Sequence, residues 1–211
     1  RDRRRVGDKV LPRHRVPRQQ VLWQVPLVAR GPQPHHELLF RGRELSGKTA
    51  CIIGTGSVGS AIARRLRAFD VQTVGINRSG HPAAEFDQTQ PTCRLDNLLP
   101  LADLVICAMP LTAETAGLFD SARIAKIKPG AVFVNVARGK VIDQQALVEA
   151  LQSRQLSGAV LDVFEEEPLP RSSPLWDMEQ VILTPHNSFV GEHNGERLFR
   201  LICKNLESFA Q

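Results

Sequence analysis

The sequence lacks an apolar run long enough to span a bilayer, and no stretch of it reads as a signal peptide. Cysteine is scarce, and Cys51, Cys93, Cys107 and Cys203 are too widely spaced to suggest a metal site or a disulfide framework. We therefore expect four reduced thiols, no metal, no membrane contact and a cytoplasmic location. Of the 211 residues, 42% are hydrophobic, which is enough for one sizeable core and a small appendage.

Positive charge is concentrated at the N-terminus. Residues 1–45 contain eleven Lys/Arg and four Asp/Glu, a net charge of +7, whereas the rest of the chain contains sixteen and eighteen, a net charge of −2. The basic run over residues 1–18 contains no aromatic side chain, which favours an irregular solvated segment over a nucleic-acid-binding tail. Apolar patches at residues 21–23 and 38–40 would pack on the domain or on a second copy of it.

The strongest local pattern is an apolar strand, a glycine turn and an amphipathic helix. Residues 49–53 precede Gly54-Thr55-Gly56-Ser57-Val58-Gly59, and an apolar stripe follows at Val58, Ile62, Leu66 and Phe69. In Gly-x-Gly-x-x-Gly the first glycine allows the tight turn, the second lets the backbone approach a pyrophosphate, and the third lets the helix pack on the strand. The N–H groups at the helix start would face the phosphates, so the pattern predicts a dinucleotide site.

Strands and helices alternate through the rest of the chain. We expect further strands at 71–76, 104–108, 131–136, 158–163 and 181–184, and helices at 95–99, 121–127, 144–152 and 196–209. This alternation predicts an α/β fold with a Rossmann-type doubly wound parallel sheet. Because ligands of such sheets bind beyond the carboxyl ends of the strands, residues just after each strand are the first candidates for function.

The end of the second strand bears on the choice of cofactor. A site that prefers NAD usually places an acidic residue there, but this sequence has Asn77, followed by Arg78 and Ser79. An acidic residue would repel a 2′-phosphate, whereas the planar guanidinium of Arg78 would bind one. The motif therefore favours NADP over NAD, the alternative being that Arg78 is only solvated.

Three later strand ends carry polar side chains. Arg138 would clamp a carboxylate through two hydrogen bonds, or would form a surface ion pair. Asp162 and the acidic run at residues 165–167 follow the next strand, and we expect two of those three acids to be solvated. His186 follows the last strand, where it would exchange a proton with a substrate while a neighbouring carboxylate orients it. Each of these residues alone more often has a structural role, but their common position at one edge of the sheet favours a functional site.

Together these motifs resemble the cofactor domain of the D-isomer-specific 2-hydroxyacid dehydrogenases. The resemblance runs from about Glu44 to Glu207 and rests on the motifs at 44–49, 110–115, 135–139, 161–168 and 184–186. It implies that Arg138 binds the substrate carboxylate, that His186 is the acid/base and that Glu167 pairs with His186. It also implies that Asp162 contacts the nicotinamide carboxamide.

The glycine turn and the resemblance together place sixteen residues along the cofactor. They are Gly54, Gly56, Ser57, Val58, Gly59, Asn77, Arg78, Ser79, Met109, Pro110, Thr115, Val136, Ala137, Arg138, Asp162 and His186.

The resemblance implies an oxidoreductase that transfers a hydride between NAD(P)H and a 2-oxo acid or D-2-hydroxy acid, as a homodimer. We expect a basic segment over 1–45, an NAD(P)-binding domain over 46–190 and a C-terminal helical segment over 191–211. The family's second, substrate-binding lobe is not recognisable, so we expect a truncated chain with impaired turnover. The alternative is a corepressor-like NAD(P)-binding regulator without turnover, although the presence of Arg138, Glu167 and His186 argues against it. Glyoxylate, hydroxypyruvate and branched-chain 2-oxo acids all remain open as substrates.

Overall fold

The computed structural model describes residues 44–188 and 190–209, and all structural statements below concern those residues. The chain divides into two units, Arg1–Glu44 and Leu45–Gln211. The basic run at 1–18 and the apolar patches at 21–23 and 38–40 lie outside the described residues.

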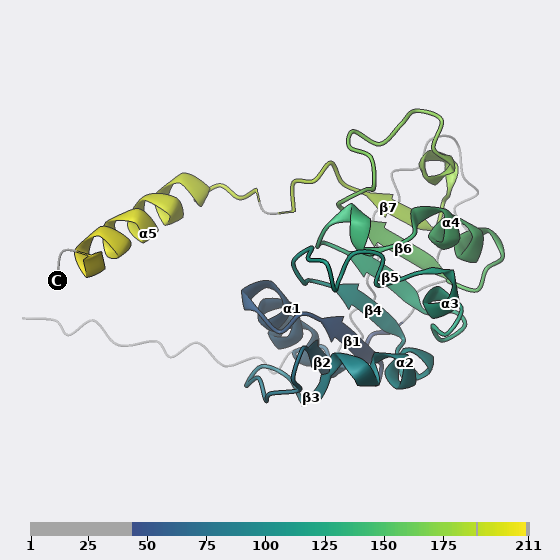
Figure 1. Ribbon diagram of the computed structural model, residues 1–211, viewed down its shortest axis with the longest axis horizontal. Coiled ribbons are helices and arrows are strands. Elements are labelled where there is room, and N and C mark those ends of the chain that lie inside the picture. The colour runs from purple at the N-terminus through teal and green to yellow at the C-terminus, as the bar shows by residue number, and fades with distance from the viewer. Residues whose placement is uncertain (1–43, 189, 210–211) are drawn as a thin grey trace, which may run out of the picture. The chain divides into compact units, whose positions relative to one another are not determined.

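The second unit is built on a seven-stranded, wholly parallel sheet (Figure 1). Its strands are β1 (Thr49–Ile53), β2 (Gln72–Asn77), β3 (Gln88–Pro91), β4 (Leu104–Cys107), β5 (Val132–Asn135), β6 (Gly158–Leu161) and β7 (Val181–Leu183). Their spatial order is β3-β2-β1-β4-β5-β6-β7, so the winding direction reverses between β1 and β4. The predicted Rossmann-type fold is confirmed. Because all seven strands are parallel, their carboxyl ends lie at one edge of the sheet.

Alternate residues of β1 face two different cores. Cys51 and Ile53 belong to the larger core, and Ala50 and Ile52 belong to a smaller one. The larger core includes buried residues of α2 (Leu95–Leu98), α3 (Ser121–Ile124) and α4 (Gln144–Gln152), whereas α1 (Ser57–Arg67) covers the smaller core. The sheet is thus covered on both faces, as parallel strands with continuous apolar runs require.

Short 3-10 helices fill several connections. They are η2 (Thr92–Arg94), η3 (Leu99–Leu101), η4 (Gly139–Val141) and η5 (Pro174–Asp177). The helix expected over 121–127 is shorter than predicted and ends at Ile124. The strands expected at 131–136 and 158–163 are shorter too, so Asp162, expected within a strand, lies in the turn that follows β6. Arg138 lies after β5, as expected.

Strand β3 and the exposure of Val58 differ from the sequence predictions. The Gln-Thr-Gln-Pro sequence of β3 has no apolar pattern, because this strand lies at the edge of the sheet and no residue of it is buried. Val58, expected on the apolar stripe of its helix, is 52% exposed. It lies in the first turn of α1, next to the glycine turn.

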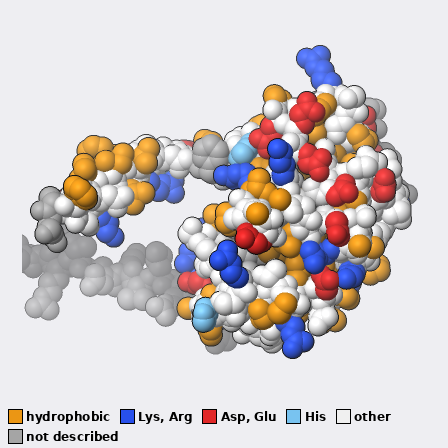
Figure 2. Space-filling model, in the orientation of Figure 1, with side chains coloured by type: hydrophobic (Ala, Val, Ile, Leu, Met, Phe, Trp, Pro, Cys, Tyr) orange, Lys and Arg blue, Asp and Glu red, His pale blue; other side chains and the backbone are white. Residues whose placement is uncertain are grey.

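The last helix, α5 (Asn194–Phe209), is strongly amphipathic but contains no buried residue. Figure 2 shows hydrophobic side chains along one side of α5 and Lys and Arg on the opposite side. The exposed apolar residues are Leu198, Phe199, Leu201, Ile202, Leu206 and Phe209. Among the described residues, no helix has the length and apolar character that crossing a membrane requires.

All four cysteines are free, and they differ in exposure. Cys51 and Cys107 are buried in β1 and β4, whereas Cys93 is exposed and Cys203 is half-buried. Burial raises the pKa of the Cys51 thiol to about 12. Burial also holds the pKa of Cys107 well above its usual value, with a smaller contribution from Cys51.

Candidate active site

The glycine turn between β1 and α1 is shaped by close backbone contacts. Gly54 has a φ of +105°, and a Cβ there would lie 2.6 Å from the carbonyl oxygen of Ala108, so the loop after β4 packs directly on the turn. A Cβ at Gly59 would lie 1.9 Å from the carbonyl oxygen of Gly54. At Gly56 a Cβ would meet nothing within 4 Å. The turn therefore leaves open space at the one glycine where a pyrophosphate is expected to approach.

The start of α1 has the electrostatic character that a phosphate requires. Its N-cap is Gly56, and within the described chain no side chain caps this end. The first turn of α1, which contains Ser57 and Val58, has no acidic residue. A dinucleotide therefore fits this end of the domain, because backbone N–H groups and the positive end of the helix dipole meet no competing carboxylate in that turn.

A cavity of about 330 Å³ opens beside the glycine turn. Its walls come from α1, from the loop after β4 and from the turn after β5. The lining residues are Val58, Ala108, Met109, Pro110, Leu111, Val136, Ala137 and Arg138. The structure thus brings together six of the residues predicted to line the cofactor.

Thr115 is hydrogen-bonded to Pro110, one of the residues that line this cavity. Its hydroxyl donates a hydrogen bond to the Pro110 carbonyl oxygen (2.7 Å) and accepts one from the Thr112 N–H (2.7 Å). Thr115 therefore braces the loop after β4 and is not one of the residues that line the cavity.

Asn77 connects the end of β2 to the glycine turn. Its Nδ2 donates to Thr55 Oγ1 (3.1 Å) and to the His81 carbonyl oxygen (2.9 Å), and its Oδ1 accepts from the Gly80 N–H (2.6 Å). The amide of Asn77 thus fixes the loop, while Arg78 and Ser79 next to it are exposed.

The charge of Arg78 reaches the loop after β4. The pKa of the Glu114 carboxyl lies below its usual value, mainly because the Thr112 hydroxyl donates a hydrogen bond to it. The positive charge of Arg78 makes a smaller contribution in the same direction. A phosphate bound at Arg78 would therefore lie near an arginine whose positive charge also acts on the Glu114 carboxylate.

Arg138 follows β5 in a turn organised by a buried amide. Asn135 is fully buried, and it accepts a hydrogen bond from the Ala137 N–H (3.0 Å) and donates one to the Arg138 carbonyl oxygen (3.1 Å). The Arg138 side chain is exposed, and its Nη1 donates to the Ala137 carbonyl oxygen (2.7 Å). Sequence reasoning noted Asn135 only as part of a motif, and its role in shaping the turn needed the structure.

Asp162 holds the loop after β7. Its side chain is buried, and Oδ1 accepts hydrogen bonds from Thr184 Oγ1 (2.5 Å) and from the Asn187 N–H (3.0 Å). The Ser188 N–H contacts both carboxylate oxygens (3.2 and 3.1 Å). Desolvation raises the pKa of Asp162, but the hydrogen bonds from Ser188, Thr184 and Asn187 outweigh it, so the net pKa is lowered.

His186 lies within the segment that Asp162 anchors, and its backbone is left-handed, with a φ of +49°. Such a conformation costs a non-glycine residue about 1–2 kcal/mol. The hydrogen bonds from Thr184, Asn187 and Ser188 to Asp162 enclose His186 on both sides along the chain. These contacts hold the strained residue in place.

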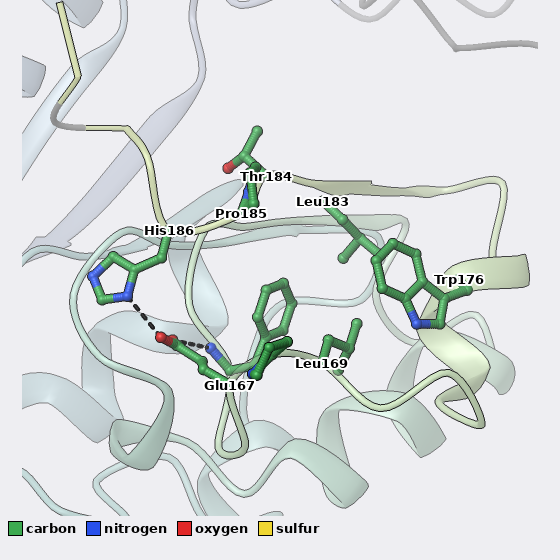
Figure 3. A pocket seen from close by; sticks show the side chains of 9 residues that line it. Glu167, Leu169, Trp176, Leu183, Thr184, Pro185 and His186 are labelled. Carbon is green, nitrogen blue, oxygen red and sulfur yellow. Dashed lines mark hydrogen bonds and ion pairs between the residues drawn. The ribbon is translucent and has the colours of Figure 1, made fainter.

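The imidazole of His186 pairs with Glu167. Nδ1 lies 2.7 Å from Glu167 Oε2, and Glu167 Oε1 accepts a hydrogen bond from the Phe164 N–H (3.0 Å). Desolvation raises the pKa of Glu167, but the hydrogen bonds from Phe164 and His186 outweigh it and keep the net pKa below its usual value. Figure 3 shows the second ring nitrogen, Nε2, turned away from Glu167.

A second cavity, of about 660 Å³, adjoins this pair. It is lined by Phe164, Glu167, Pro168, Leu169, Trp176, Leu183, Thr184, Pro185 and His186. Figure 3 shows Leu169, Leu183 and Trp176 grouped at the end away from His186. The His186–Glu167 pair, the Arg138 turn and the glycine turn thus all lie at the carboxyl ends of strands of the same parallel sheet.

Known proteins resemble this chain in sequence and in fold. Residues 23–188 match the sequence model for the D-isomer specific 2-hydroxyacid dehydrogenase, NAD binding domain. A glyoxylate reductase of Pyrococcus furiosus is 40% identical over 174 residues, which is 82% of this chain and 52% of the relative. The chain spans about half the length of the curated relatives it matches.

Solved structures agree with the sequence matches. A D-isomer specific 2-hydroxyacid dehydrogenase family protein from Aeromonas salmonicida is 40% identical with a TM-score of 0.74, over 80% of this chain and 54% of that protein. The NADPH-dependent glyoxylate/hydroxypyruvate reductase of Sinorhizobium meliloti, in complex with NADP and sulfate, is 33% identical with a TM-score of 0.73 over the same shares.

Proposed function

The chain belongs to the D-isomer-specific 2-hydroxyacid dehydrogenase family, and from that premise we propose that it interconverts a 2-oxo acid and a D-2-hydroxy acid with a nicotinamide dinucleotide. The observation that supports this most is the His186–Glu167 pair, with Nδ1 and Oε2 2.7 Å apart, at the same sheet edge as Arg138 and the glycine turn. An acid/base, a carboxylate clamp and a dinucleotide site are the three parts that the reaction needs.

In the proposed mechanism the bound nicotinamide supplies the hydride that C2 of the 2-oxo acid gains. Protonated His186 gives the proton on Nε2 to the carbonyl oxygen, which becomes the hydroxyl, and it takes that proton back in the reverse direction. Glu167 accepts the Nδ1–H hydrogen bond, which fixes the orientation of the ring and leaves Nε2 for the substrate. Arg138 holds the substrate carboxylate with its two-pronged guanidinium, so that C2 faces the cofactor cleft.

We propose NADP as the preferred cofactor and glyoxylate or hydroxypyruvate as the first substrates to test. Asn77 and Arg78 at the end of β2 support NADP, because no acidic side chain follows that strand to repel a 2′-phosphate. The Sinorhizobium meliloti neighbour was crystallised with NADP, and the names of the relatives indicate these two substrates.

We also propose a homodimer in the cytoplasm, with the chain divided at residues 45 and 190. The exposed apolar side of α5 supports association, because such faces are usually covered in solution. Four free thiols, two of them in the core, support a reducing compartment. Sedimentation of the purified chain would test the dimer, and a monomeric mass at micromolar concentration would contradict it.

The deciding experiment is oxidation of NADPH and NADH by the purified chain with a panel of 2-oxo acids. We expect reduction of at least one 2-oxo acid, and we expect His186→Ala and Arg138→Ala to abolish it. Absence of turnover in a folded chain that binds cofactor would contradict the dehydrogenase proposal for these 211 residues and favour a regulator.

A further inference from the structure

Glu165 follows β6 within the three-acid run, and it is bonded to another element although it is exposed. Its Oε1 accepts a hydrogen bond from the Gln144 N–H (2.9 Å) at the start of α4, and its own N–H donates to Gln144 Oε1 (3.2 Å). The two residues thus satisfy each other's backbone N–H groups reciprocally. Helix α4 is itself anchored in the larger core by Leu147 and Leu151, so Glu165 is tied to a rigid element.

The backbone next to Glu165 contacts the turn that carries Arg138. A Cβ at Gly139 would lie 1.7 Å from the Phe164 carbonyl oxygen and 2.5 Å from the Glu165 nitrogen. The N–H of Phe164, in turn, donates to Glu167 Oε1 (3.0 Å). The short loop from Phe164 to Glu167 therefore touches α4, the Arg138 turn and the acid/base pair.

From these contacts we infer that Glu165 is a positioning residue, which holds the Glu167 loop in register with the Arg138 turn through its reciprocal hydrogen bonds to Gln144. This inference deepens the proposed function and rests on it for its catalytic meaning. The geometric part is independent of turnover, because it concerns only where the Glu167 carboxylate is held.

The test is the titration of the Glu167 carboxyl, followed by 13C NMR in the full chain and assigned with Glu167→Gln. The charged groups facing it are His186, which lowers its pKa, and Asp162, which raises it. In Glu165→Ala the loop loses its tie to α4 and the Phe164 hydrogen bond loosens, so we expect the midpoint to rise by about one unit. If Glu165 acted only through its negative charge, its removal would lower the Glu167 midpoint. Positioning and charge therefore predict shifts of opposite sign.

Glu166→Ala is the matched control, because Glu166 is the neighbouring exposed acid and its loss changes the charge equally. We expect this variant to leave the midpoint unchanged or slightly lower. Glu165→Gln keeps an oxygen that can accept from Gln144, so it should restore the wild-type midpoint. If Glu165→Ala does not fold, Gln144→Ala removes the other half of the exchange and should raise the midpoint by a smaller amount.

An unchanged or lower midpoint in every folded Glu165 and Gln144 variant would overturn the inference. The proposed function fails separately, through absent turnover in the wild-type chain. Where turnover is measurable, Glu165→Ala should lower kcat about tenfold and leave the dissociation constant of the cofactor unchanged, since the glycine turn is not touched.

Discussion

The two ends of the candidate site are held in place by different forces. At the cofactor end, Gly54 and Gly59 set the shape by steric fit, and a single added methyl group at Gly59 would overlap the Gly54 carbonyl oxygen at 1.9 Å. At the catalytic end, carboxylates do the holding: Asp162 fixes the His186 segment, and Glu167 pairs with the imidazole. The cofactor end depends on how closely its backbone segments approach one another, and the catalytic end depends on ionised side chains.

This difference matches the two ligands that the proposed function requires. A pyrophosphate is large and already charged, so the protein needs only open N–H groups and space. A proton transfer needs a ring held in one orientation, and fixed hydrogen bonds provide it. The comparison predicts that added side-chain volume disrupts the cofactor end, whereas a fall in pH leaves it unchanged. At the catalytic end a fall in pH should be disruptive, because the carboxylates that hold it become protonated.

The largest effect is expected at the third glycine of the turn. Gly59→Ala forces α1 away from β1, which should cost about 2 kcal/mol of unfolding free energy and abolish dinucleotide binding. Gly56→Ala is the matched control, because its added methyl meets no protein atom within 4 Å. Thermal unfolding should therefore be normal in Gly56→Ala while titration shows cofactor binding lost. Equal stability of the two alanine variants would break the steric account.

Asp162 provides the corresponding test at the catalytic end. Asp162→Asn should destabilise the chain by about 1–2 kcal/mol near neutral pH, because a neutral amide replaces the buried, charged acceptor of three hydrogen-bond donors. The folded-state pKa of Asp162 is lowered, so its stabilising contribution is present above the unfolded-state value of about 3.9 and is lost as the pH falls through the folded-state value. The difference between wild type and variant in denaturant unfolding should shrink below about pH 4.

Asp87 offers a control next to β3, the outer strand on the side of the sheet opposite β7. Its carboxylate accepts hydrogen bonds from the Thr73 N–H and hydroxyl, and both lower its pKa, the bond from the N–H more strongly. Asp87→Asn should show similar acid dependence of stability, yet leave the His186 NMR signals unshifted. A shift of those signals only in Asp162→Asn would show that Asp162 holds the His186 segment in place. Equal shifts in both variants would contradict that role.

Arg78 sharpens the comparison by adding charge to the cofactor end. Arg78→Ala should weaken NADP binding about tenfold and leave NAD binding within twofold, since only NADP carries the 2′-phosphate. Isothermal titration with both dinucleotides measures the ratio, and NAD is the internal control. A parallel loss for both cofactors would mean that Arg78 supports the loop and does not select between them.

The smallest effect on stability is expected outside both ends, on α5. Phe199→Ser should change the free energy of unfolding by no more than about 0.5 kcal/mol, because that side chain is 67% exposed. The same change should lower self-association measured by sedimentation. A large loss of stability without any change in mass would contradict a role in association.

Much of the fold was predictable because its signals are local. The apolar runs of β1 and β4, the glycine spacing and the stripe of α4 each depend on neighbouring residues, and the predicted positions of these elements agree with the structure within a residue. Strand β3 was missed because an edge strand that buries little needs no apolar residues. Val58 belongs to the apolar stripe of α1, yet it is 52% exposed and lines the smaller cavity, because periodicity does not separate core residues from apolar residues that line a cavity.

The candidate site was predictable as a set of strand ends, but not as a network. The run at residues 165–167 suggested two solvated acids, yet Glu165 is bonded to Gln144, twenty-one positions away along the chain. The contacts of Asp162 with the His186 segment span a similar separation. Such pairings arise from the winding of the sheet, which brings distant turns to one edge, and no local pattern encodes them.

The unequal burial of the four cysteines makes the natural sequence suitable for selective labelling. Thiol reagents attack the thiolate, and with a pKa of about 12 Cys51 supplies almost none near neutral pH, as does the fully buried Cys107. Maleimide dyes should therefore react at Cys93 and Cys203 and leave the sheet intact. One of these thiols lies beside the sheet and the other on α5, so energy transfer between two dyes would follow α5 as cofactor is added, without any engineered cysteine.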